Sequence, residues 1–190
     1  VTIAFNTCSG GIGGNGYFSG NGAAGQAVGG GIYRLSGTVN VDNCLFAANT
    51  ANTGPSLYGT FNSNGGHNLV QSTDVNLVWT GSTAGNIENT DPLILPLENN
   101  GGETDTHRVQ SCNPISPAID AASSLAPAQD QIDQPRIATA DIGALESPSA
   151  VAVFLPADTV LCIGQTLLLD VTAPDATYLW SDGSTGPTLF

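Results

Sequence analysis

Residues 99–146 read NNGGETDTHRVQSCNPISPAIDAASSLAPAQDQIDQPRIATADIGALE, and this stretch separates two segments of different composition. Before it, the chain is rich in Gly and Asn and almost uncharged, because the only charged side chains ahead of Glu88 are Arg34, Asp42 and Asp74. After it, a short acidic segment begins a new alternation of apolar residues. We therefore expect the stretch to close one domain and to precede a second one.

The overall charge limits the possible partners. Lys is absent, 3 Arg stand against 16 acids, and the net charge is −13. Such a surface opposes binding to nucleic acid phosphates and to anionic membranes. No apolar run approaches the roughly 20 residues that cross a bilayer, so we expect no membrane insertion. The start at Val1 lacks the basic region of a signal peptide, which predicts that the sequence begins inside a longer protein.

A repeat of 25 to 28 residues runs through the first half of the chain. Asn21 aligns with Asn49 at an offset of 28, and residues 30–33 (GGIY) align with residues 55–58 (PSLY) at an offset of 25. Residues 38–42 (TVNVD) alternate with the period of two that is typical of a strand. Stacked coils of short parallel strands, joined by Gly and Asn turns, fit this repeat and would place Asn21 and Asn49 in one ladder.

Flexible loop is the alternative interpretation of a segment so rich in Gly and Asn, but aromatic and β-branched positions recur in register. We therefore predict an all-β fold. Residues 1–98 are expected to form a right-handed parallel β-helix, and residues 99–147 its C-terminal cap. Residues 151–190 are expected to form an incomplete Ig-like or PKD-like β-sandwich.

Five segments between residues 49 and 146 form a recognisable series: NTANTGPSLYGTF (49–61), GGHNLV (65–70), TDPLILPLENNGGETDTHRV (90–109), SPAIDAA (116–122) and DQ(x)4R(x)4DIGALE (130–146). They resemble the C-terminal region of bacterial surface proteins that carry the choice-of-anchor Q domain. Members of that family are right-handed β-helix proteins whose tails end in varied anchoring signals. Two departures are a DQRG motif that reads DQID at residues 130–133, and an insertion at residues 110–113.

The cap has a structural purpose, because the end of a β-helix exposes unpaired strand edges and an apolar cross-section. Residues 99–102 (NNGG) predict a turn after an apolar strand. We expect His107 to be a semi-buried histidine with satisfied hydrogen bonds. Arg136 is expected to pair with one of three acids, Asp120, Asp130 or Asp141. The structural residues of the cap are then His107, Asp120, Arg136 and Asp141.

The same polar residues suggest two other roles, a catalytic one and a calcium-binding one. His107, Ser116 and Asp120 supply the residue types of a hydrolase triad, but there is no GxSxG elbow, and Ser116 precedes a proline in an extended dipeptide. We therefore expect no catalytic residue here. Asp130 and Asp133 are calcium candidates, although their spacing matches no EF-hand or RTX repeat. No other cofactor is expected.

An enzyme on the coils themselves is also not expected. A polysaccharide lyase needs a basic side chain beside a calcium-binding carboxylate, and the coils offer only Arg34 with Asp42 and Asp74. A glycosidase needs two opposed carboxylates, whereas these two acids lie more than one coil apart in sequence. Four aromatic residues of the first half resemble sugar-stacking positions, although core positions explain them as well: Tyr17, Tyr33, Tyr58 and Trp79.

The last forty residues begin after a short linker, SPSA at residues 147–150. Cys162 and Trp180 resemble the core pair of an Ig domain, but the segment offers about three strands where a sandwich needs about seven. We therefore expect Cys162 to be a free thiol. The other cysteines (Cys8, Cys44 and Cys112) lack CxxC or His spacing, which argues against zinc and leaves disulfides open.

Together these features predict a non-catalytic segment of a secreted or cell-surface protein, with a structural or adhesin role. Glycans or other surface proteins are the expected partners. The alternative is the C-terminal part of a secreted β-helix polysaccharide lyase or glycoside hydrolase whose active site lies upstream of Val1. Further near-neutral repeats upstream would favour the first interpretation, and an Asp cluster with a Lys or Arg would favour the second.

Overall fold

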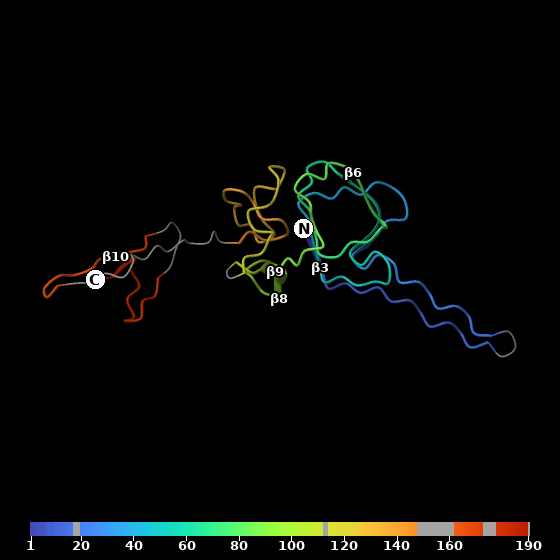
Figure 1. Cartoon of the computed structure of the whole chain (residues 1–190), viewed down its shortest axis with the longest axis horizontal. Helices are drawn as coiled ribbons and strands as arrows, with labels where there is room; N and C mark the ends of the chain where they lie inside the picture. The colour runs from blue at the N-terminus through green and yellow to red at the C-terminus, as the bar shows by residue number, and fades with distance from the viewer. Residues whose placement is uncertain (17–19, 112–113, 148–161, 173–177, 190) are drawn as a thin grey trace. The chain divides into compact units, whose positions relative to one another are not determined.

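The computed structural model describes residues 1–16, 20–111, 114–147, 162–172 and 178–189. The described residues are all-β with turns and bends, and they contain no helix that is long and apolar enough to cross a membrane. The chain divides into two compact units, residues 1–148 and residues 149–190. Figure 1 shows the whole chain, and each unit is described here by itself.

A four-stranded parallel sheet forms the centre of the first unit, and its strand order follows the chain. Thr2 lies beside Leu45, Leu45 beside Leu69, and Leu69 beside Ile87. Each strand is therefore separated from the next by a full circuit of chain. The strands are β1 (Thr2–Ala4), β3 (Leu45–Ala47), β5 (Leu69–Val70) and β7 (Ile87–Glu88).

A second parallel sheet takes the strands between them: β2 (Ile32–Tyr33), β4 (Leu57–Ser63) and β6 (Leu77–Gly81). Ile32 pairs with Leu57, and Tyr33 pairs with Tyr58. This register confirms the sequence alignment at an offset of 25. The next circuit is shorter: Gly59 pairs with Leu77, which is an offset of 18 residues instead of 25.

The main core lies between the two sheets. Phe46 and Val70 of the first sheet pack with Leu57 and Phe61 of the second, and Val41 completes the cluster. All five are buried, with at most 2% of their surface exposed. Burying each such side chain stabilises the fold by about 1.5–3 kcal/mol.

The other face of the first sheet packs against residues 116–147. This second cluster consists of Leu45, Ala47, Leu69, Ala118, Ala122 and Ile142. Because both faces of β3 are covered, its three residues are all buried and the strand reads as a continuous apolar run, Leu45-Phe46-Ala47. Residues 116–147 therefore cover the side of the sheet that points away from the main core.

The predicted ladder of Asn21 and Asn49 is wrong. Asn49 instead lies beside Asn6, whose backbone N–H donates to the Asn49 Oδ1 at 3.0 Å. Asn49 Nδ2 donates to the Ile3 carbonyl at 2.8 Å, which binds one circuit to the next. Asn21 lies elsewhere, and its side chain accepts a hydrogen bond from Gly16.

The cause is an inserted arm between Thr7 and Val28. Thr7 pairs with Thr50, and Val28 pairs with Thr53. The chain therefore advances by three residues from Thr50 to Thr53, but by twenty-one residues between the equivalent positions, Thr7 and Val28. Figure 1 shows the two sides of this arm running next to each other, in blue. Its backbones approach so closely that a Cβ at position 10 would lie 1.9 Å from the Gly25 carbonyl oxygen. Only glycine fits there.

An antiparallel hairpin follows the two sheets, formed by β8 (Ile94–Glu98) and β9 (Thr106–Val109). A register shift between Ile94 and Leu97 bends it. The predicted turn at residues 99–102 lies in its connection, where the chain bends at residues 101–104.

The described part of the second unit contains one antiparallel pair, β10 (Leu169–Asp170) and β11 (Thr188–Leu189). Cys162 is a free and exposed cysteine, as predicted, and it is therefore no buried partner for Trp180. The Trp180 indole instead donates to the Gly186 carbonyl at 2.8 Å. Residues 151–161, where the Ig-like or PKD-like module is expected to begin, lie outside the described residues.

Candidate functional site

Two buried carboxylates organise residues 116–147. The Asp141 side chain is 2% exposed, and its oxygens accept hydrogen bonds from the Asp120 amide at 2.8 Å and the Ser147 amide at 2.7 Å. Burial raises the pKa of the Asp141 carboxyl and Glu146 adds to the increase, although the two amides oppose it. Asp141 thus links the backbone at Asp120 to the backbone at Ser147.

The Asp130 carboxylate also accepts hydrogen bonds from backbone amides. Its Oδ1 accepts from the Ile132 and Gln134 amides at 2.9 Å, and its Oδ2 accepts from the Glu146 amide at 2.9 Å. Asp133 is exposed and its backbone has a φ of 60°. A calcium ion at Asp130 would have to displace backbone donors. Among the described residues, no group of three or more His, Cys, Asp or Glu side chains is placed to hold a metal ion.

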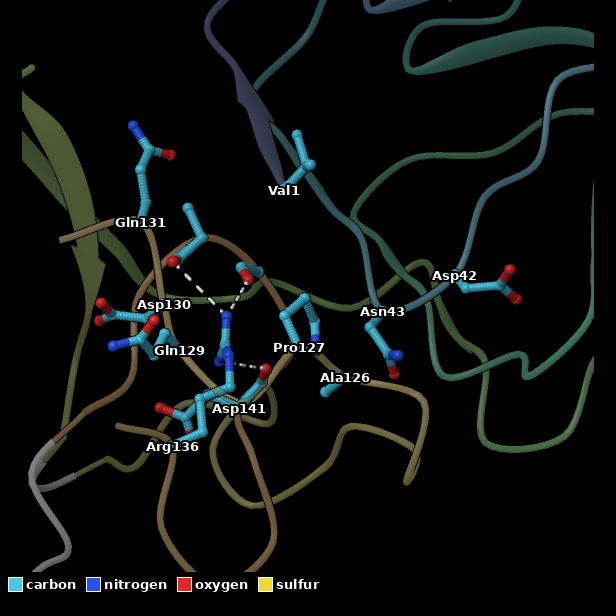
Figure 2. Close-up of a pocket in the computed structure, with 12 residues that line it drawn as sticks. Val1, Asp42, Asn43, Ala126, Pro127, Gln129, Asp130, Gln131, Arg136 and Asp141 are labelled. Atoms are coloured by element: carbon cyan, nitrogen blue, oxygen red, sulfur yellow. Dashed lines mark hydrogen bonds between the residues drawn. The ribbon is translucent and has the colours of Figure 1, made fainter. Parts of the chain in front are cut away.

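Arg136 pairs with Glu146 and with none of the three acids named from the sequence. Its Nη1 lies 3.0 Å from the Glu146 Oε2, and the two side chains are only 7% and 6% exposed. The guanidinium also donates to the carbonyl oxygens of Asp141 at 3.0 Å and Gly143 at 2.8 Å. Figure 2 shows Arg136 next to Asp141, with dashed lines for its hydrogen bonds to the residues drawn. Sequence reasoning missed Glu146, although it ends the DIGALE motif.

The catalytic residue types are not assembled. His107 lies on β9, where its Nδ1 is 2.7 Å from the Leu95 carbonyl oxygen and its ring lies 5.1 Å from that of Phe5. This confirms a semi-buried histidine with a satisfied hydrogen bond. The Ser116 hydroxyl is buried and donates to the Pro92 carbonyl at 2.6 Å. Asp120 contributes its amide to Asp141, at a backbone φ of 52°.

A cavity of about 350 Å³ lies in the first unit, where Val1 and residues 42–43 meet residues 126–144. Figure 2 shows side chains from both segments around it. The buried Nε of Arg136 is one of three buried side-chain polar atoms without a hydrogen-bond partner in the described part of the chain. The lining residues are Val1, Asp42, Asn43, Ala126, Pro127, Gln129, Asp130, Gln131, Arg136, Asp141, Gly143 and Ala144.

The charged residues of the coils also hold the backbone. Asp42 Oδ1 accepts from the Ser63 hydroxyl at 2.7 Å and from the Gly65 amide at 2.7 Å. Asp74 accepts from the Gly54 amide at 2.6 Å, one circuit earlier. Arg34 Nε donates to the Gly37 carbonyl at 2.8 Å.

Hydrogen bonding sets the acidity of these two carboxyls. Burial by itself raises the pKa of Asp42, but hydrogen bonds from Ser63 and the backbone of residues 64–66 outweigh it, so the pKa lies below its ordinary value of 3.8. The pKa of Asp74 is lowered in the same way, with Gly54 and Asn76 as the donors. Both side chains are therefore charged hydrogen-bond acceptors at neutral pH.

This acidity predicts a pH-dependent contribution of Asp42 to stability. A carboxyl whose pKa is lowered by folding stabilises the protein above the unfolded value of 3.8, and the contribution is lost as the pH falls through the folded pKa. We expect Asp42→Asn to lower the free energy of unfolding by about 1 kcal/mol near pH 6, since an uncharged acceptor binds its donors less strongly. Urea denaturation near pH 6 and near pH 3 measures the effect. A difference that stays constant between the two pH values would contradict it, and Asp133→Asn serves as the exposed control.

The aromatic residues singled out from the sequence separate into two groups. Trp79 packs against Phe61, with ring centroids 6.3 Å apart, and its indole donates to Glu88 at 2.6 Å. Trp79 is therefore a partly buried residue that packs against the main core. Tyr33 and Tyr58 lie on the surface of the second sheet, while Tyr17 lies outside the described residues.

Comparisons with protein families, with curated proteins and with solved structures find no match for this chain. The resemblance to the choice-of-anchor Q region therefore stays a prediction. The function has to be argued from the contacts described above.

Proposed function

We propose that this chain is a non-catalytic structural segment of a secreted or cell-surface protein. Residues 1–98 are a right-handed parallel β-helix, residues 99–147 are its cap of the choice-of-anchor Q type, and residues 151–190 begin an Ig-like module. The observation that carries the proposal is that the few charged side chains of residues 1–87 form hydrogen bonds with the backbone. In residues 1–87 all three charged side chains hold backbone groups, which is a structural use of charge.

The strand arrangement supports the architectural part of the proposal. Seven strands alternate between two parallel sheets, and each sheet takes its strands in chain order. Stacked circuits of this kind make stability a sum over neighbours, so the array can be lengthened without a new core. A rod built in this way suits a protein that holds other parts at a distance.

The polar residues near the end of the first unit support a locking role. Asp130, Asp141 and Arg136 bind mainly backbone groups of residues 120–147, and Ala118 and Ile142, which lie within residues 116–147, cover the first sheet. These buried hydrogen bonds favour one conformation of a segment in which the structure describes no strand.

The proposal is tested by looking for turnover. The purified chain is incubated with polygalacturonate, xylan and β-glucan, with and without calcium, and new reducing ends and unsaturated products are measured. We expect neither product above the level of a heat-denatured sample. Product formation that is lost in an Asp42→Asn or Asp74→Asn variant would place a catalytic site on the coils and overturn the proposal.

A further inference from the structure

The outer face of the second sheet has an ordered surface. Leu57 and Phe61 of β4 point into the core, so the alternation of a strand turns Tyr58, Thr60 and Asn62 outward. Each of these three residues has an outward-facing partner on a neighbouring strand. Tyr33 lies beside Tyr58, Val78 beside Thr60, and Thr80 beside Asn62.

The first row is a pair of tyrosine rings. Their centroids are 5.3 Å apart and the ring planes are inclined by 51°, and Tyr33 is 50% exposed. The same local structure supports both rings. Gly29 and Gly54 have φ values of 69° and 59°, and a Cβ on either would lie 2.7 Å from the tyrosine Cβ four residues later. The two glycines thus leave room at the base of each ring.

The third row consists of amides and hydroxyls. Asn62 Nδ2 donates to the Asn40 Oδ1 at 2.8 Å, and Asn40 is exposed. The exposed Thr80 hydroxyl donates to the Phe61 carbonyl at 3.1 Å. Between this row and the tyrosines lie Thr60 and the exposed Val78, which join the aromatic row to the polar one.

The described residues that make up this face carry no charged side chain: Tyr33, Tyr58, Thr60, Asn62, Val78 and Thr80. Arg34, next to Tyr33, bends back to the Gly37 carbonyl, and Asp74 is held by Gly54 and Asn76. The face is therefore neutral in a chain whose net charge is −13. An anionic ligand would be repelled by the rest of the protein, and a cationic one would find no carboxylate here.

We propose that this face binds a neutral glycan chain that lies across the strands of the second sheet. Tyr33 and Tyr58 present amphipathic rings, which can stack on the C–H faces of sugar rings and keep a hydroxyl in water. Asn40, Asn62 and Thr80 can exchange hydrogen bonds with sugar hydroxyls, in part through water. This inference rests on the proposed function, since it gives the structural segment an adhesive surface.

Isothermal titration calorimetry with four hexasaccharides tests the proposal on the full chain: cellohexaose, laminarihexaose, mannohexaose and hexagalacturonate. We expect binding of at least one neutral hexasaccharide and none of the acidic one. Tyr33→Leu should weaken that binding at least tenfold, because it removes the ring but keeps an apolar side chain in the same place. Asn40→Ala should weaken it several-fold, and it changes an exposed side chain outside the core.

The control is Tyr178→Leu, which is the same substitution in the second unit, and it should leave the affinity unchanged. Thermal unfolding of every variant shows whether the fold is kept. Absence of binding to all three neutral probes overturns the proposal, as does binding of hexagalacturonate alone or equal affinity of wild type and Tyr33→Leu. If the chain neither binds nor cleaves glycans, the glycan-binding proposal is wrong but the proposed structural function is not contradicted. If the chain cleaves glycans, the proposed non-catalytic function is wrong but glycan binding at this face is not contradicted.

Discussion

The Arg136→Met variant is expected to lose about 3–5 kcal/mol of unfolding free energy, the amount typical of breaking a buried ion pair. Arg136 and Glu146 are 7% and 6% exposed, so removal of the guanidinium leaves the Glu146 carboxylate buried without its cation. The carbonyls of Asp141 and Gly143 lose a donor at the same time. Urea denaturation followed by circular dichroism and by tryptophan fluorescence gives the free energy and its slope.

Arg34→Met is the matched control for this experiment. The Arg34 side chain donates to the Gly37 carbonyl, in contacts that are exposed to solvent. We expect its replacement to change the free energy of unfolding by about 0.5 kcal/mol or less. Equal losses for the two arginines would show that Arg136 does not lock the end of the first unit.

Asn68→Ala is expected to destabilise the first unit by about 2–4 kcal/mol. Asn68 is fully buried, its Oδ1 accepts from the Cys44 amide at 3.0 Å, and its Nδ2 donates to the Val41 carbonyl at 2.9 Å. The variant leaves both backbone groups without these partners, and each unsatisfied buried group costs about 1–3 kcal/mol. The free energy is measured by urea denaturation, as for Arg136.

Two further variants separate the possible causes. Asn52→Ala changes an exposed asparagine of a neighbouring corner and should have little effect. Asn68→Asp keeps the acceptor but removes the donor to Val41 and buries a charge, so it should destabilise at least as much as Asn68→Ala. If Asn68→Ala were as mild as Asn52→Ala, the buried asparagine would not bind one circuit to the next.

The sequence allowed the second sheet to be predicted better than the first. Residues 29–33 (GGGIY) and 54–58 (GPSLY) share a glycine, an apolar residue and a tyrosine at equivalent positions, and the structure pairs the apolar residues and the tyrosines in register. The alignment of Asn21 with Asn49 failed because it counted the inserted arm as a circuit. The true neighbour of Asn49 is Asn6, and nothing in the composition distinguishes a glycine-rich arm from a glycine-rich turn.

For the polar network, the sequence identified the residues better than their partners. Arg136 and Asp141 stand in a recognisable motif, but the backbone between them passes through positive φ at Ala138, with a value of 49°. A non-glycine residue in that region is uncommon and is not indicated by its type. The turn it makes decides which acid Arg136 meets, and the acid is Glu146.

The arm between Thr7 and Val28 has an evolutionary consequence. Its ends remain paired with Thr50 and Thr53, as though no residues had been added between them. Lengthening a closed loop sevenfold costs about 2 kcal/mol of closure entropy, which a stack of hydrogen-bonded circuits can absorb. The corner is thus a place where new sequence enters without disturbing the core, and where a foreign peptide can be grafted for display.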